Sequence, residues 1–145
     1  MSDDNKSDDQ ISELLRSVRN IALVGASNSP ERPSYGVMEF LIAKGYDVHP
    51  INPGLAGKNL LGREVFASLA DVPAPVDMID IFRNSQAAGE VIRSAIPMKG
   101  RLGLKAVWMQ LGVRNDEAAD EAKAAGLIVV FDRCPKIEIA RLRLK

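Results

Sequence analysis

Short, fully apolar runs alternate along this chain with segments of helical periodicity, and this alternation limits the folds open to it. Residues 21–24 are apolar at every position, which is typical of a strand covered on both faces. Residues 34–44 then carry apolar side chains at helical spacing, and Gly45 stands at the expected helix end. Strands that alternate with helices over short links form parallel sheets with right-handed crossovers. The chain is therefore predicted to be α/β, with a three-layer doubly wound, mostly parallel sheet in a single domain.

The same pattern continues to residue 131, beyond which the sequence is basic and no element is predicted. Asn115 is the expected cap of the last predicted helix, because its side chain can accept a hydrogen bond from the first turn. The further strands are predicted at 46–51, 77–82, 105–109 and 127–131, with a brief one near 64–66, and the further helices at 85–96 and 115–125.

The N-terminal segment is acidic. Residues 1–10 contain four aspartates and are predicted to be a disordered, solvated tail, so that the domain covers residues 11–145. Apolar residues at helical spacing over 11–18 predict a short helix, for which Asp8 or Asp9 is the expected cap.

Composition argues against several classes of protein. The formal net charge is zero, so there is no basic field to attract nucleic acid or an anionic membrane. No apolar run approaches the about 20 residues of a transmembrane helix, and the acidic N-terminus is unlike a signal peptide. These features predict a cytoplasmic location. The single cysteine, Cys134, leaves no internal disulfide, and no His/Cys cluster has metal-ligand spacing.

Small and polar residues follow each predicted strand. Because the carboxyl ends of parallel strands meet at one edge of a sheet, ligands of such folds bind there. Amides, hydroxyls and guanidinium groups at this edge suit an anionic ligand with many hydrogen-bonding groups, although Asn84, Ser85 and Asn115 have a simpler interpretation as helix caps. In strand order, the residues are Gly25, Ala26, Ser27 and Asn28; Asn52, Pro53 and Lys58; Arg83, Asn84 and Ser85; Gln110, Leu111 and Gly112; and Asp132, Arg133, Cys134 and Pro135.

The loop after the first strand occupies the place of a phosphate-binding turn but lacks the dinucleotide pattern G-x-G-x-x-G. Gly25 takes the first position, whereas Ser27 and Pro30 take the other two. The end of the second strand also lacks the acidic residue that binds an unmodified ribose. Arg32 and Lys58 stand near the site instead, and cations suit a phosphorylated ribose. NADP and coenzyme A both carry such a phosphate, and the spacing does not separate them.

Five blocks of sequence resemble a known family, in the order in which the family has them. They read GASNSPERPSYGVMEFLIAKGYDVHPINP, SLADVP, DIFRNS, VWMQLGV and FDRCPKIE. These blocks are similar to the small stand-alone CoA-binding proteins, relatives of the CoA-binding domain of the succinyl-CoA synthetase alpha subunit. The likeness covers about residues 20–138. It implies a Rossmann-like domain that binds coenzyme A, with no established reaction for the stand-alone members.

The resemblance also implies which residues would contact coenzyme A. The first loop would hold the phosphates, the second loop would border the adenosine, and the third and fourth loops would follow the pantetheine arm. Whether Arg32 or Lys58 meets the 3′-phosphate stays open. The residues are Gly25, Ala26, Ser27, Asn28, Arg32, Pro33, Ser34 and Tyr35 at the phosphates, Asn52, Pro53 and Lys58 at the adenosine, and Phe82, Arg83, Asn84, Gln110 and Gly112 along the arm.

The sequence predicts no catalytic set. The one histidine, His49, lies inside the second predicted strand, where a packed side chain is the expected role and no Ser-His-Asp set can form. Asp80 lies inside a predicted strand and is expected at a sheet edge or hydrogen-bonded. Cys134 is interpreted either as a half-buried apolar residue or as a thiol that forms a mixed disulfide with coenzyme A.

These observations predict a non-catalytic protein that binds coenzyme A or an acyl-CoA. One alternative is an NADP-dependent oxidoreductase that uses the same cations at the ribose phosphate. Another is an interaction subunit of a ligase or acyltransferase, in which coenzyme A is bound but not transformed. A homodimer is a further arrangement that the sequence leaves open.

Overall fold

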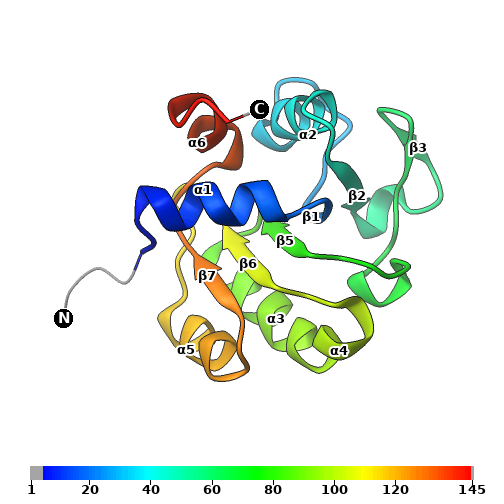
Figure 1. The fold of residues 1–145 in the computed structure, drawn as a ribbon. Helices are drawn as coiled ribbons and strands as arrows, with labels where there is room; N and C mark the ends of the chain where they lie inside the picture. Colours follow the sequence, from blue (N-terminus) through cyan, green and yellow to red (C-terminus); the bar gives the residue numbers. More distant parts are fainter. Residues whose placement is uncertain (1–4, 145) are drawn as a thin grey trace.

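Five parallel strands form the centre of the computed structural model, which describes residues 5–144 (Figure 1). Their order across the sheet is β2–β1–β5–β6–β7. The prediction of these strands is confirmed, and every strand end lies within one residue of its predicted position. The strands are β1 (Asn20–Val24), β2 (Asp47–Ile51), β5 (Met78–Ile81), β6 (Ala106–Met109) and β7 (Ile128–Val130).

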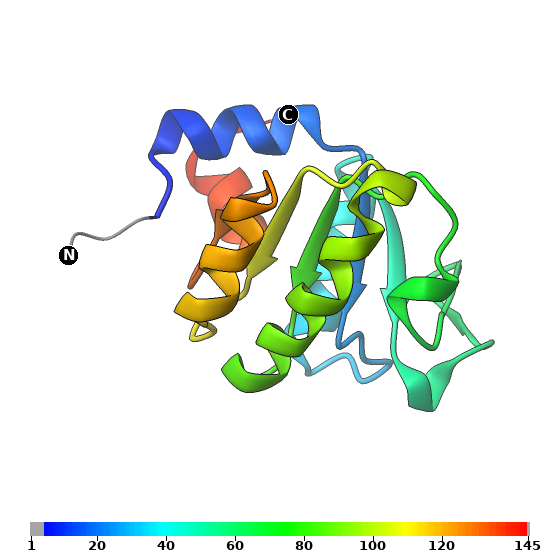
Figure 2. The ribbon, with the colours of Figure 1, turned by 90° about the horizontal axis from the view of Figure 1, so that it is seen from below.

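Helices cover both faces of the sheet, which confirms the three-layer α/β architecture (Figure 2). Side chains of successive strand residues enter the two layers alternately, so Trp108 packs in one core and Val107 in the other. Within residues 5–144, every helix is too short or too polar to span a bilayer. One face carries α1 (Asp8–Ser17), α2 (Pro33–Ala43) and α6 (Pro135–Arg141), and the other carries α3 (Ser85–Ala95), α4 (Lys99–Leu102) and α5 (Asp116–Ala124).

The strand order reverses between β1 and β5. The chain first crosses from β1 to its neighbour β2 and then returns past β1 to form β5 on the other side. The chain therefore adds a strand on one side of β1 first and adds the next strand of the sheet on its other side. Such a reversal opens a crevice at the carboxyl ends of the two strands, where ligands of open α/β sheets bind.

The first helix begins earlier than predicted. It starts at Asp8, inside the segment predicted to be a tail, and its cap is Ser7. The Ser7 hydroxyl accepts a hydrogen bond from the N–H of Gln10, while the Gln10 side chain accepts one from the N–H of Ser7. This capping box satisfies two N–H groups at once, so the prediction of Asp8 or Asp9 as the cap is wrong.

Asn5 fixes the segment before this helix to the edge of the sheet. Its side-chain nitrogen donates to the Phe131 carbonyl at 2.7 Å, and its side-chain oxygen accepts from the Phe131 N–H at 3.3 Å. The asparagine side chain thus pairs with the backbone just beyond β7. The prediction of a disordered tail remains untested only for residues 1–4, which lie outside the described residues.

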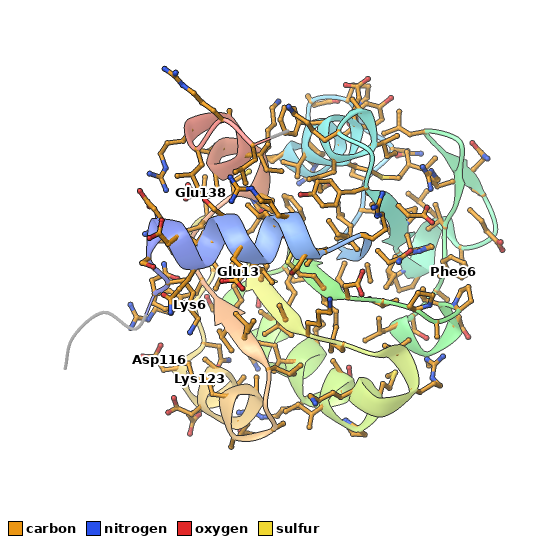
Figure 3. All side chains as sticks on the ribbon, viewed as in Figure 1. Lys6, Glu13, Phe66, Asp116, Lys123 and Glu138 are labelled. Carbon is orange, nitrogen blue, oxygen red and sulfur yellow. The ribbon has the colours of Figure 1, made fainter. Side chains whose placement is uncertain are left out.

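The C-terminal segment forms α6, which the sequence analysis did not predict. Glu138 on this helix is 4% exposed and lies where α6 faces α1 (Figure 3). It accepts a hydrogen bond from Arg141 at 2.6 Å and lies 3.7 Å from the Arg133 guanidinium. Arg141 also pairs with Asp8 of α1 at 2.8 Å. Two basic residues of this segment, Arg133 and Arg141, therefore bind carboxylates within the fold.

The glycine-rich segment between β2 and β5 forms a small hairpin where only one brief strand is predicted. The hairpin consists of β3 (Asn59–Leu60) and β4 (Arg63–Glu64), flanked by 3-10 turns at Pro53–Leu55 and Leu69–Asp71. After it, Phe66 bridges to Ile51 at the outer edge of β2. The bridge brings the segment alongside the carboxyl end of the sheet.

Asp80 is buried in the middle of the sheet. It lies in β5 between Leu23 of β1 and Trp108 of β6, is 0% exposed, and neither carboxyl oxygen has a hydrogen-bond partner among residues 5–144. The expectation of an edge position or a hydrogen bond is therefore wrong, because this side chain faces an apolar layer. Burial raises the pKa of Asp80 well above its ordinary value, so its carboxyl group stays protonated where an exposed aspartate is ionised.

The substitution Asp80→Asn is expected to remove a pH dependence of stability. In the unfolded chain, the Asp80 carboxyl group ionises once the pH exceeds its ordinary pKa, whereas in the folded protein burial keeps it protonated. The wild-type protein therefore loses stability as the pH rises from about 4. The loss is at most about 1.4 kcal/mol per pH unit. Urea unfolding between pH 4 and pH 8 measures it, and the advantage of the variant should grow steadily with pH. Parallel stability curves for the two proteins would contradict the assignment.

Candidate functional site

The loop after β1 is fixed to the end of β2. The N–H groups of Gly25 and Ala26 both donate to the Ile51 carbonyl, at 3.1 and 3.2 Å, and the Asn52 side chain donates to the Ala26 carbonyl at 2.7 Å. The Asn52 side-chain oxygen accepts from the Gly54 N–H at 2.8 Å. The loops after β1 and β2 therefore form one unit at the carboxyl edge of the parallel sheet, toward which the arrowheads of β5 and β6 point in Figure 2.

Gly25 is required where this loop passes the end of β5. Its φ is +90°, which disfavours side chains, and a Cβ atom there would lie 2.4 Å from the Phe82 carbonyl oxygen. The same atom would lie 3.2 Å from Cδ of Arg83, so the arginine side chain runs along the glycine. The glycine thus allows the first and third loops to touch.

The N-terminus of α2 opens beside this loop without a side-chain cap. Arg32 is the N-cap residue, its side chain makes no capping hydrogen bond, and Pro33 occupies the first turn. The Ser27 hydroxyl accepts from the N–H of Ser29 at 3.0 Å and so shapes the loop before the helix. A helix N-terminus without a side-chain acceptor favours an anion through its N–H groups and its dipole.

Asparagines cap two of the helices on the other face of the sheet, α3 and α5. The Asn84 side chain accepts from the Ala87 N–H at 2.8 Å at the start of α3, and Asn115 does the same for α5. Ser85 instead accepts a hydrogen bond from the Arg114 N–H at 3.0 Å. The simpler interpretation is therefore confirmed for the two asparagines.

A cavity of about 910 Å³ opens at the carboxyl ends of the strands, between α3 and the loops that follow β1, β2, β5 and β6. This volume falls within the range of cavities that hold small molecules and cofactors. Most of the predicted site residues come together here. Those that line the cavity are Gly25, Ala26, Ser27, Arg32, Pro33, Ser34, Asn52, Pro53, Phe82, Arg83, Asn84 and Gln110.

Four predicted site residues do not line this cavity. Asn28 and Lys58 are exposed in their loops, and Tyr35 packs against the core beneath α2. The Gly112 N–H donates to the Asp132 carboxylate at 2.7 Å. Their predicted contacts with a ligand therefore have no support from the cavity.

Most of the apolar wall of the cavity was not predicted from the sequence. Leu69 and Leu111 lie within two of the sequence blocks that resemble the family. The sequence pattern does not distinguish an apolar residue that lines a cavity from one that packs in the core. Val91 and Ser94, three positions apart on α3, show the side of that helix that faces the cavity. Leu111 was expected at the ligand edge but was not assigned a ligand contact, and the missed residues are Val24, Ile51, Ala67, Ser68, Leu69, Val91, Ser94 and Val113.

The cavity is positively charged. Its ionisable lining residues are Arg32 and Arg83, and neither forms a salt bridge with any residue from 5 to 144. Glu31 lies beside the first loop, where a hydrogen bond from Ser29 lowers the pKa of its carboxyl group and Arg32 adds a smaller effect. Arg32 is thus partly balanced by this exposed carboxylate, whereas Arg83 has no salt-bridge partner among the described residues.

His49 and Cys134 lie outside the cavity lining. His49 is half-buried in β2, where burial lowers its pKa, and its ring centroid lies 6.4 Å from that of Phe66. Cys134 is 5% exposed at the start of α6 and packs in the core between this helix and the sheet. The packed histidine and the apolar interpretation of the cysteine agree with these positions.

Comparison with known proteins places this geometry in a family. The family model for the CoA binding domain matches residues 19–140. The protein YneT of Bacillus subtilis is 31% identical over 137 residues, which cover 92% of this chain and 94% of YneT. A solved structure of a hypothetical protein from Pyrococcus horikoshii has 38% identity and a TM-score of 0.88, and the match covers 99% of both chains.

A longer relative has an assigned reaction. The alpha subunit of ADP-forming acetate–CoA ligase I from Pyrococcus furiosus is 29% identical over 99 residues, or 66% of this chain. The match spans only 21% of the ligase subunit. The family model covers most of the globular part of this chain, including the loops that line the cavity. The chain therefore belongs to the CoA-binding domain family.

Proposed function

We propose that this protein binds coenzyme A, or an acyl-CoA, without transforming it. The observation that carries the proposal is the cavity at the reversal of strand order, which combines a helix N-terminus that has no side-chain cap with two arginines that form no salt bridge within residues 5–144. A ligand with several phosphates gains from both features. The family match supports coenzyme A as that ligand.

The pyrophosphate lies, in this proposal, against the first loop and the N-terminus of α2. Gly25 lets the backbone approach closely, and the N–H groups of the helix supply donors. Arg32 is the proposed partner of the 3′-phosphate, because it lines the cavity and Lys58 does not.

The apolar wall suits the rest of the molecule. Leu69 and Val91 offer surface to an adenine ring or to the arm, and Leu111 is 56% exposed at the cavity. An acyl group attached to the thiol would remove part of Leu111 from water. The lining also favours binding over chemistry, because its ionisable groups are guanidinium groups that stay charged at neutral pH.

A second candidate is favoured by the match to the ligase subunit, in which a CoA-binding domain belongs to a longer chain. Under this proposal the domain presents bound coenzyme A to a separate ligase or acyltransferase. It uses the same cavity, so the first test is common to both.

Calorimetric titration with coenzyme A, dephospho-CoA, NADP and NAD tests the proposal. Coenzyme A should bind most tightly, and dephospho-CoA should lose about 1–3 kcal/mol because it lacks one charge-assisted contact. Hexanoyl-CoA should bind at least as well as coenzyme A if the acyl group covers Leu111. Tighter binding of NADP would overturn the proposal in favour of an oxidoreductase.

The substitution Arg32→Gln should weaken the binding of coenzyme A by about tenfold, the effect of losing one charge-assisted contact at an exposed site. The affinity for dephospho-CoA should hardly change, since the group that Arg32 contacts is absent. Arg16→Gln on the outer side of α1 is the matched control. If Lys58→Gln shows the selective loss instead, Lys58 rather than Arg32 holds the 3′-phosphate.

The substitution Gly25→Ala should abolish measurable coenzyme A binding and lower the free energy of unfolding by more than about 2 kcal/mol. The new Cβ adds a clash with the Phe82 carbonyl to the strain of a positive φ. Gly45→Ala is the control, because Gly45 has φ +98° but nothing within 4 Å of the added atom. Urea unfolding measures the loss in free energy of unfolding for each variant, and the difference between the two losses is the contribution of the clash. Equal losses would contradict the role assigned to the Phe82 carbonyl.

A further inference from the structure

The turn that follows β6 places an exposed leucine at the cavity. It spans residues 110–113, and the Val113 N–H closes it by donating to the Gln110 carbonyl at 2.9 Å. Gly112, the third residue, has a φ of +79°, as a type II turn requires. Leu111, the second residue, is 56% exposed and lines the cavity. Because so little of this leucine packs against the core, its position depends on what holds the turn.

Asp132, just beyond β7, anchors this turn. Its carboxylate accepts a hydrogen bond from the Gly112 N–H at 2.7 Å, and its own N–H donates to the Val113 carbonyl at 3.2 Å. The hydrogen bond that closes the turn does not use the Gly112 N–H, so Asp132 supplies the acceptor that this donor needs. Two hydrogen bonds therefore fix the turn to the residue that follows the last strand.

The backbone of Asp132 has a conformation that few residues adopt. Its φ is +54°, in the left-handed region, which is unfavourable for most residues with a Cβ and is tolerated best by aspartate and asparagine. On one side, the Asn5 side chain bonds both backbone groups of Phe131. On the other, the Arg133 carbonyl accepts from Nε1 of Trp108 at 2.7 Å. Such conformations persist where the surroundings fix them, and they concentrate beside ligand sites.

The order of the strands determines which part of coenzyme A reaches this turn. The proposed phosphate site lies at the loop after β1, and the loop after β2, on one side of it, borders the adenosine in the proposed mode. The turn follows β6, on the other side of β1 and beyond β5. A ligand bound in this way directs its thiol end across β5 toward β6. An acyl group on the thiol then lies at Leu111.

We infer that Asp132 is a positioning residue that holds Leu111 against an aliphatic acyl group and thereby makes the site prefer acyl-CoA to free coenzyme A. The inference rests on the proposed binding of coenzyme A. Asp132 does not line the cavity itself, so it acts through the turn. An acyl chain that covers Leu111 removes apolar surface from water, and a turn that is already fixed keeps the entropic cost of this contact low.

The test titrates adenosine 3′,5′-bisphosphate, coenzyme A and hexanoyl-CoA into the wild-type protein, Asp132→Gly and Asp132→Asn. Glycine adopts a positive φ without strain but removes the acceptor, whereas asparagine keeps an acceptor oxygen and tolerates this φ. Asp77→Ala is the matched control. The Asp77 carboxylate also accepts backbone N–H groups, from Arg19 and Asn20, but it lies at the amino end of β5.

The wild-type protein should bind hexanoyl-CoA about five- to twentyfold more tightly than coenzyme A, the effect of burying a few methylene groups. Asp132→Gly should reduce this preference to about twofold or less, while its affinity for the bisphosphate, which lacks the arm, stays within about twofold of the wild type. Asp132→Asn and Asp77→Ala should keep the wild-type preference. A merely structural loss would weaken all three ligands alike.

A double-mutant cycle with Leu111→Ala shows whether Asp132 acts through the leucine. Leu111→Ala should lose the preference for hexanoyl-CoA, and adding Asp132→Gly should change it no further, because the two substitutions remove one contact. Should Asp132→Gly not fold, Asp132→Glu replaces it, since the longer side chain moves the carboxylate by one methylene. The same loss of preference is expected there, and an unchanged preference contradicts the role.

Equal affinity of the wild-type protein for hexanoyl-CoA and coenzyme A overturns the inference while coenzyme A binding still stands. A preference that survives in Asp132→Gly or in Leu111→Ala overturns it as well. If the wild-type protein binds none of the three ligands, the proposed function itself fails.

Discussion

The close approach of three backbone segments at Gly25 is the constraint on which the site depends. The Ile51 carbonyl accepts two N–H groups from the first loop, and the Phe82 carbonyl stands where any Cβ of residue 25 would be. The ends of β2, β1 and β5 are thereby joined at the reversal of strand order. The loops after β1, β2 and β5, which line one side of the cavity, are positioned by this junction.

The same junction explains why the loop lacks the dinucleotide glycines. A second and a third glycine would give a ligand access to more backbone, but here Ser27 uses its hydroxyl to hold the N–H of Ser29. The loop is shaped by a side chain, and Pro33 then sets the start of α2. A loop of this kind presents a helix N-terminus to an anion while keeping its own conformation fixed.

The strands and much of the cavity lining were predictable from sequence because they depend on local patterns. Runs such as 21–24 are apolar throughout, and residues that follow them must reach the carboxyl edge. Other features depend on distant partners. The helix α6 is stabilised by Glu138 between two arginines, and its sequence alone reads as a basic tail. The outward position of Lys58 likewise depends on a hairpin whose path no local pattern specifies.

Asp80 and Gln110 show why burial of a polar residue does not by itself indicate function. Asp80 lies within a strand and Gln110 directly follows one. Both side chains are buried, with oxygen atoms that lack a hydrogen-bond partner among residues 5–144. One carboxyl group escapes the cost by holding its proton. A neutral amide has no such means, so its cost persists in the folded protein. Gln110 lines the cavity and Asp80 does not, but burial without a partner is common to both residues and so does not distinguish a binding residue from a packed one.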